Sequence, residues 1–174
     1  MKPQPGPMSD DEREILRHTV ATLAYRAEKV LRDAPEGFAE LRISPASRTP
    51  LEVVNHMCDL MTWGERMARG TYKWEPVAVA SWPAAVERFF ATLAAFDAAL
   101  AERPGVTYQA EVIFQGPVAD ALTHVGQLAM LRGTMSAAVR PESYAQADIT
   151  VGRVGREQSG QRTEFDGDAS RPKR

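Results

Sequence analysis

The stretch Thr49-Pro50-Leu51-Glu52-Val53-Val54-Asn55-His56 contains the clearest helix start in this sequence. Thr49 can cap a helix N-terminus, Pro50 suits the first helical position, and Glu52 completes a capping box with Thr49. The helix is expected to end near Gly70, because glycine is favoured just past a helix C-terminus. Its apolar stripe consists of Val53, Leu60, Trp63 and Met67. This spacing predicts an amphipathic helix that packs against other helices.

Three further stretches repeat apolar residues at steps of three and four, which also predicts helices. They cover residues 10–33, 81–103 and 116–138. The first follows a capping box of Ser9 and Glu12, and the last opens with Gly116-Pro117. Apolar residues alternate over 106–114, which predicts a short extended connection. Four long helices without a convincing set of strands predict an all-α bundle.

The composition favours a soluble protein of the cytoplasm. The 21 basic and 23 acidic residues nearly cancel, so no strong field attracts nucleic acid or anionic lipid. No apolar run reaches the roughly 18 residues that a membrane span needs. Cys58 is the single cysteine, so no intramolecular disulfide can form, as is usual in a reducing compartment. We therefore expect neither a nucleic-acid nor a membrane partner.

The 174 residues divide into three parts. Residues 1–140 are expected to form the bundle, because a chain of this size with 44% apolar residues can build a single core. Residues 141–158 are expected to form a C-terminal extension packed on the bundle. Residues 159–174 are almost wholly polar, so we expect a disordered tail that buries too little apolar area to offset its ordering entropy.

Three side chains that bind metals fall where two helices can bring them together. His56 lies between Val53 and Leu60 at helical spacing, so an ionisable group sits on a core-facing stripe and needs a partner. Asp120 and His124 are four residues apart, which places both on one face of the last helix. Two imidazoles and one carboxylate can hold one side of a divalent metal ion and leave other coordination positions open.

The last helix also carries an apolar stripe, on the side opposite Asp120 and His124. The stripe consists of Val118, Leu122, Val125 and Ala129. If the polar face looks into the bundle, the stripe must pack against the C-terminal segment or a second subunit. We therefore expect a homodimer built on this helix.

The helix order, the histidine midway along the second helix and the stretch Asp120-Ala121-Leu122-Thr123-His124-Val125-Gly126-Gln127 resemble the DinB-like superfamily of metalloenzymes. The resemblance covers about residues 10–140. It implies a four-helix bundle with one long crossover connection, often dimeric, with zinc or nickel bound by His56, His124 and the residue at position 120. The family pattern continues after His124 in Gly126-Gln127 and Leu131-Arg132.

Asp120 departs from the family, which usually has histidine at this position. Aspartate also ligates zinc, iron and manganese, so iron or manganese joins zinc and nickel as a candidate ion. Its charge should weaken the power of the ion to acidify a bound water or thiol. Some relatives are thiol-dependent transferases or isomerases, so the resemblance implies a metal-dependent transferase or hydrolase that acts on a small thiol or another small substrate. The alternative is a non-catalytic dimeric bundle with a structural metal or none.

The candidate ligands also have structural interpretations. Asp120 could merely complement the dipole at a helix start. His56 and His124 could be hydrogen-bonded to the backbone or to Asp120 without any metal. Gln127 shares the ligand face, where it could hydrogen-bond a ligand or a bound water, or could simply be a polar residue at the rim.

Four other residues are expected to be structural. His18 lies at the flank of an apolar stripe and is not expected to bind metal. Cys58 points about 200° around the helix from His56 and should be a small buried hydrophobe. Trp63 and Met67 are expected to belong to the core.

Overall fold

The computed structural model describes residues 8–102 and 108–165. Its elements, in order, are α1 (Asp10–Leu31), α2 (Pro50–Ala68), α3 (Trp82–Ala101), α4 (Ala110–Ile113), a π-helix (Phe114–Val118), α5 (Ala119–Thr134) and a 3₁₀-helix (Tyr144–Gln146). The predicted capping boxes are present at Ser9 and at Thr49. Within the described residues no strand forms beyond one isolated bridge between Glu142 and Glu164, so the prediction of an all-α fold is confirmed. No described helix is long and apolar enough to cross a membrane.

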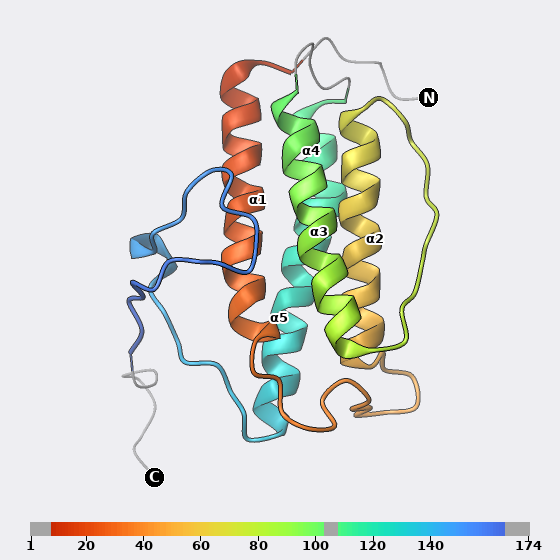
Figure 1. The fold of residues 1–174 in the computed structure, drawn as a ribbon, viewed down its shortest axis with the longest axis vertical. Coiled ribbons are helices and arrows are strands. Elements are labelled where there is room, and N and C mark those ends of the chain that lie inside the picture. The colour runs from red at the N-terminus through yellow and green to blue at the C-terminus, as the bar shows by residue number, and fades with distance from the viewer. Residues whose placement is uncertain (1–7, 103–107, 166–174) are drawn as a thin grey trace.

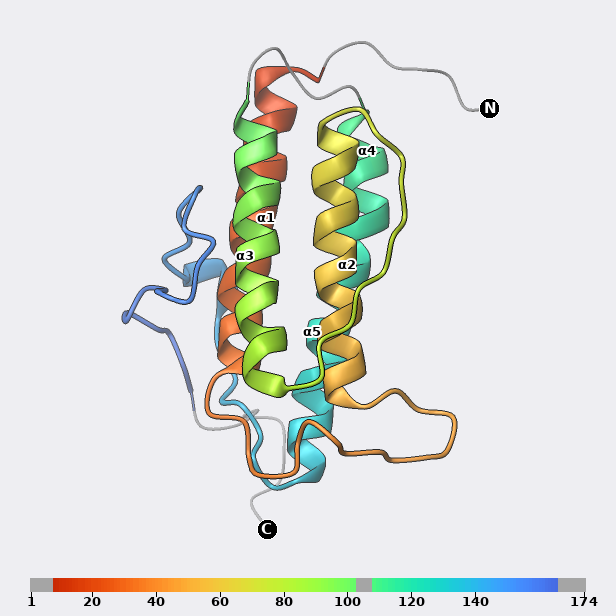
Figure 2. The same cartoon turned by 45° about the vertical axis from the view of Figure 1, so that its right-hand side comes forward.

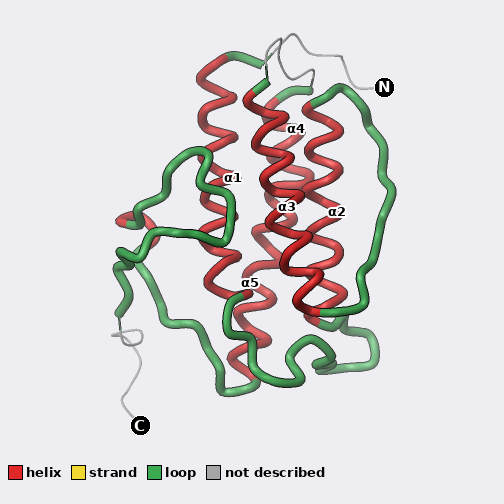
Figure 3. The backbone as a smooth tube through the Cα atoms, in the orientation of Figure 1, coloured by secondary structure: helices red, strands yellow, loops and turns green. Residues whose placement is uncertain are grey.

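The long helices α1, α2, α3 and α5 lie side by side along one axis (Figures 1 and 3). α2 and α3 run in the same direction, because the chain returns along the outside of the bundle between them (Figure 2). This return, residues 69–81, is called the crossover strap below. The predicted bundle with a long crossover connection is therefore confirmed.

The segment before α5 was predicted wrongly as extended. Residues 106–107 lie outside the described residues, but Ala110–Ile113 is α-helical and Phe114–Val118 forms the π-helix. Pro117 lies inside this helix rather than at its start. Proline has no N–H for the regular helical hydrogen bond, and the wider π turn accommodates that loss. A short apolar run fits an alternating or a helical pattern, which explains the error.

The core fills the space between the four long helices and leaves little room where α2 meets α3. A Cβ atom added to Gly64 on α2 would lie only 2.8 Å from Cζ of Phe96 on α3, so these helices approach closely at a residue without a side chain. Val118 and Val125 are buried in the same core, while Leu122 and Ala129 are only partly buried. The apolar stripe of the last helix is therefore covered in part within one subunit, and Leu122 and Ala129 stay partly open.

The C-terminal segment packs on α1 through buried charges. Lys29 Nζ lies 2.7 Å from Glu142 Oε2, and both side chains are almost fully buried. The Tyr25 hydroxyl donates to the same carboxylate. Burial alone would raise the pKa of Glu142, but the hydrogen bonds from Lys29 and Tyr25 outweigh it and lower the pKa below its ordinary value.

The same network extends into residues 159–165, the first part of the segment that was expected to be disordered. Arg162 pairs with Glu28 of α1 at 2.6 Å, and Glu164 Oε1 lies 2.7 Å from Lys29 Nζ. Residues 159–165 are thus held against the bundle, and the remainder, 166–174, lies outside the described residues. Charged groups anchor this segment, so its lack of apolar residues did not reveal the contact.

Replacing Lys29 by Met should lower the free energy of unfolding by about 3–5 kcal/mol, because the buried Glu142 carboxylate loses the cation at 2.7 Å and keeps only Arg162, at 3.9 Å. Urea denaturation monitored by circular dichroism measures this change. Lys73→Met removes an exposed partner of Glu75 and should change stability by less than about 1 kcal/mol. Equal losses in the two variants would contradict a special role for the buried pair.

Candidate metal centre

Two helices bring together the three residues that the sequence singled out. His56 lies on α2, and Asp120 and His124 lie one turn apart on α5. One ligand atom from each of the three lies within 4.8 Å of the others. Within the described part of the chain, these three side chains form a group that could hold a metal ion.

The carboxylate of Asp120 lies between the two imidazoles. His56 Nε2 is 3.4 Å from Asp120 Oδ2, and His124 Nε2 is 3.5 Å from Asp120 Oδ1. The two imidazole rings have centroids 5.0 Å apart and stand nearly perpendicular to one another. Both Nε2 atoms therefore face the same carboxylate, one at each oxygen.

Gln127 fixes the orientation of one of these rings. Its Oε1 lies 2.7 Å from His124 Nδ1, so the amide oxygen accepts the proton of Nδ1. A neutral imidazole protonated at Nδ1 directs the Nε2 lone pair toward Asp120. The contact between this nitrogen and the carboxylate oxygen at 3.5 Å becomes favourable when a metal ion lies between them or when the ring carries a second proton. Hydrogen bonding from the second ring nitrogen is also how metal-binding histidines are commonly oriented.

The cluster is buried on one side and open on the other. His124 is 7% exposed, whereas 46% of the Asp120 side chain is accessible. Burial is the main cause, and the electrostatic effects of the neighbouring Arg48 and His124 add to it, so that the pKa of His56 is lowered below its ordinary value. The imidazole of His56 is therefore neutral at neutral pH, the state that binds a metal.

A helix-dipole role does not explain Asp120. The backbone remains helical upstream of α5 through the π-helix and α4, so Asp120 is not at a free helix start. The N–H of Ala119, the residue that directly follows the π-helix, already donates to the backbone carbonyls of Gly116 and Phe114. The carboxylate instead lies against both imidazoles.

A group of aromatic side chains that the sequence did not assign to the site begins beside His56. Trp74 of the crossover strap has its ring centroid 5.7 Å from that of His56. Trp63 contacts Trp74 at 5.8 Å and Tyr72 at 5.2 Å. Trp63 is thus only partly a core residue, whereas Met67 is fully buried as predicted. Trp74 and Tyr72 were missed because the strap has no periodic pattern that would place them.

The remaining candidates take no part in the cluster. His18 is exposed on α1, away from the three ligands. Cys58 is buried as predicted, and burial raises the pKa of its thiol to about 12. It is therefore an inert thiol at neutral pH.

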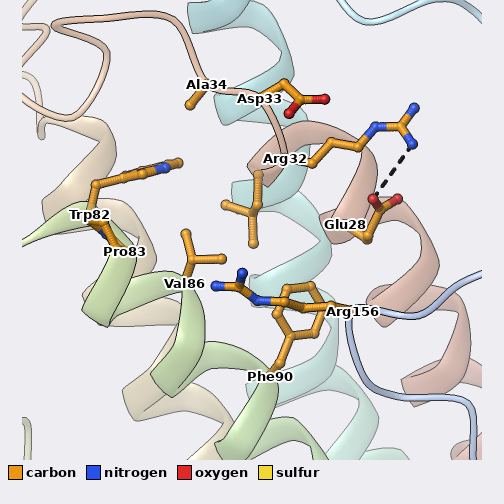
Figure 4. A pocket seen from close by; sticks show the side chains of 10 residues that line it. Glu28, Arg32, Asp33, Ala34, Trp82, Pro83, Val86, Phe90 and Arg156 are labelled. Atoms are coloured by element: carbon orange, nitrogen blue, oxygen red, sulfur yellow. Dashed lines mark ion pairs between the residues drawn. The ribbon is translucent and has the colours of Figure 1, made fainter.

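A hollow of about 350 Å³ lies between α1 and α3 and shares no residue with the cluster (Figure 4). Apolar side chains such as Val86 and Phe90 form its floor, and Arg156 of the C-terminal segment lies across it. It contains no histidine or cysteine, so it lacks the softer ligands that transition metals favour. The cluster of His56, Asp120 and His124 is therefore the better candidate for a metal centre.

Comparison with protein-family models, with curated proteins and with solved structures gave no match.

Replacing Gln127 by Ala should weaken zinc binding about tenfold or more, because His124 loses the group that orients its ring. Competition with a chromophoric chelator measures the dissociation constant. Gln146→Ala makes the same chemical change on the 3₁₀-helix, outside the cluster, and should leave the constant unchanged. An unaltered constant in Gln127→Ala would show that this amide does not support the site.

Proposed function

We propose that the chain is a divalent-metal-dependent enzyme of the DinB-like type. The observation that supports this proposal is the arrangement of three ligand atoms, from His56, Asp120 and His124, around a position that is open on the Asp120 side. Structural zinc sites usually close with four protein ligands. Three ligands on one side leave room for a substrate, as catalytic sites do.

The donor set fits zinc or nickel, and its carboxylate also suits iron or manganese. When bound, such an ion would act as a Lewis acid and carry the nucleophile of the reaction. Two neutral imidazoles and one carboxylate would leave a divalent ion with a net positive charge. Gln127 would hold His124 in the tautomer that binds, and His56 would supply its neutral imidazole.

We propose as the reaction a thiol-dependent transfer or a metal-dependent hydrolysis, in the cytoplasm, where a small thiol remains reduced. The thiol would come from the substrate or a co-substrate, because Cys58 is buried and protonated. The alternative is a non-catalytic bundle in which the same residues hold a structural metal or none. The exposed Asp120 carboxylate favours the catalytic proposal, because it leaves the position of the ion accessible.

Protein purified without chelator should contain about one equivalent of a transition metal by elemental analysis. Asp120→Ala should retain less than about a tenth of an equivalent, because the carboxylate that joins the two imidazoles is lost. His18→Ala removes an exposed histidine outside the cluster and should keep the full content. Less than about a tenth of an equivalent in the wild type would argue against the site.

The same protein distinguishes a catalytic from a structural site after substitution with cobalt(II). Binding of a small thiol at an open position should add a sulfur-to-cobalt absorption band. A cobalt spectrum that stays unchanged when a thiol or another small ligand is added would favour the closed, structural alternative.

We also propose a homodimer through the outer face of α5. Leu122 and Ala129 are only partly buried there, and Met130 is 61% exposed. A second copy would cover these side chains. Light scattering should give about twice the 19.2 kDa mass of the chain, and a stable monomer would contradict the dimer.

A further inference from the structure

The crossover strap is held in place by polar contacts with α2. The Val79 N–H donates to Asn55 Oδ1 at 2.9 Å, and the Asn55 side-chain amide donates back to the Val79 carbonyl at 3.0 Å. The Val77 N–H donates to Asp59 Oδ1 at 3.0 Å. Asn55 and Asp59 are both buried, so these contacts are protected from water. The strap therefore does not need its aromatic side chains to stay on the bundle.

Four aromatic residues extend in a row from the metal cluster toward the far end of α2. They are Trp74, Trp63, Tyr72 and Tyr108, called the aromatic row below. Trp74 begins the row beside His56, with ring centroids 5.7 Å apart, and Tyr108 ends it, 6.1 Å from Tyr72. Gly116 of the π-helix lets the indole of Trp63 lie close, because a Cβ there would be 3.3 Å from the ring.

The aromatic row exposes apolar surface next to a polar site. Tyr72 is 63% exposed and Trp74 is 43% exposed, although packing alone would favour covering such large rings. The indole Nε1 of Trp63 is buried and has no acceptor among the described residues. The row therefore offers exposed ring surface that begins beside the cluster, at Trp74.

The charges around the row favour a neutral apolar group over a cation. Glu75 follows Trp74 in the strap, but its carboxylate is paired with Lys73 at 2.6 Å and with Arg66 at 2.8 Å. It therefore adds little negative potential to the rings. A planar apolar group can stack on exposed rings without any charge, at the distances seen between aromatic side chains.

We propose that the aromatic row binds the organic part of the substrate, a planar aryl or conjugated group attached to the atom that reaches the cluster. This inference rests on the proposed metal-dependent function and names its substrate class. Trp74 is the specificity-determining residue, because it is the ring of the row that lies against a metal ligand. Tyr72 extends the surface farther along α2.

Two probes that differ only in this group test the proposal. Acetohydroxamate and benzohydroxamate carry the same metal-chelating head, and benzohydroxamate adds a phenyl ring. In isothermal titration calorimetry, the zinc-loaded protein should bind benzohydroxamate about tenfold more tightly than acetohydroxamate, after correction for the ratio of the two affinities for free zinc. Benzohydroxamate should also quench tryptophan fluorescence, which acetohydroxamate should not.

Variants of the strap assign the preference to the row. Trp74→Ala should reduce the affinity ratio to about one, and Trp74→Phe should restore most of it, because a ring is kept. Val77→Ala truncates another exposed apolar residue of the same strap and should leave the ratio unchanged. Elemental analysis of each variant should give the same zinc content, since none of these residues is a ligand.

The outcomes separate the two proposals. If the protein binds zinc and both hydroxamates equally well, or if Trp74→Ala keeps the preference, the aromatic substrate class is wrong and the metal site stands. If the wild type binds no zinc, the metal-dependent function fails, and the substrate class that rests on it fails as well.

Discussion

The close contact between two parallel helices determines much of this structure. α2 and α3 approach so closely at Gly64 that a single methyl group there would collide with Phe96. Parallel neighbours cannot be joined by a short turn, so the chain must return along the full length of the bundle (Figure 2). The crossover strap is that return, and it places Trp74 beside His56. A packing requirement in the core thus decides which side chains surround the candidate site.

The cluster itself depends on the contact between α2 and α5. α2 presents His56 and α5 presents Asp120 and His124, and neither helix alone has three candidate ligands. Gln127 adds the contact that orients His124, from the next turn of the same helix. The relative positions of Asp120, His124 and Gln127 are therefore fixed by α5 itself. The position of His56 relative to them depends on how α2 packs against α5.

Patterns within single helices predicted the residues of the cluster, whereas contacts between distant parts of the chain were not predicted. A histidine on an apolar stripe and an acid four residues before a second histidine are signals within single helices, and the structure brings all three side chains together. The path of the strap is set by Asn55 and Asp59, whose hydrogen bonds to Val79 and Val77 have no sequence signature. The pair of Arg162 with Glu28 spans 134 residues, so composition alone suggested an unattached tail.

The π turn before α5 shifts the position of the buried face between the helical segments on its two sides. Ile113 and Val118 are both fully buried although they are five residues apart, a spacing that an α-helix would place on different faces. Beyond Val118 the buried positions return to steps of three and four, through Ala121, Val125 and Leu128. The buried faces of the segments before and after residues 114–118 therefore do not follow one common α-helical register. A one-residue insertion or deletion in the early part of this helix could be absorbed at the π turn, and the register of Asp120 and His124 would be preserved.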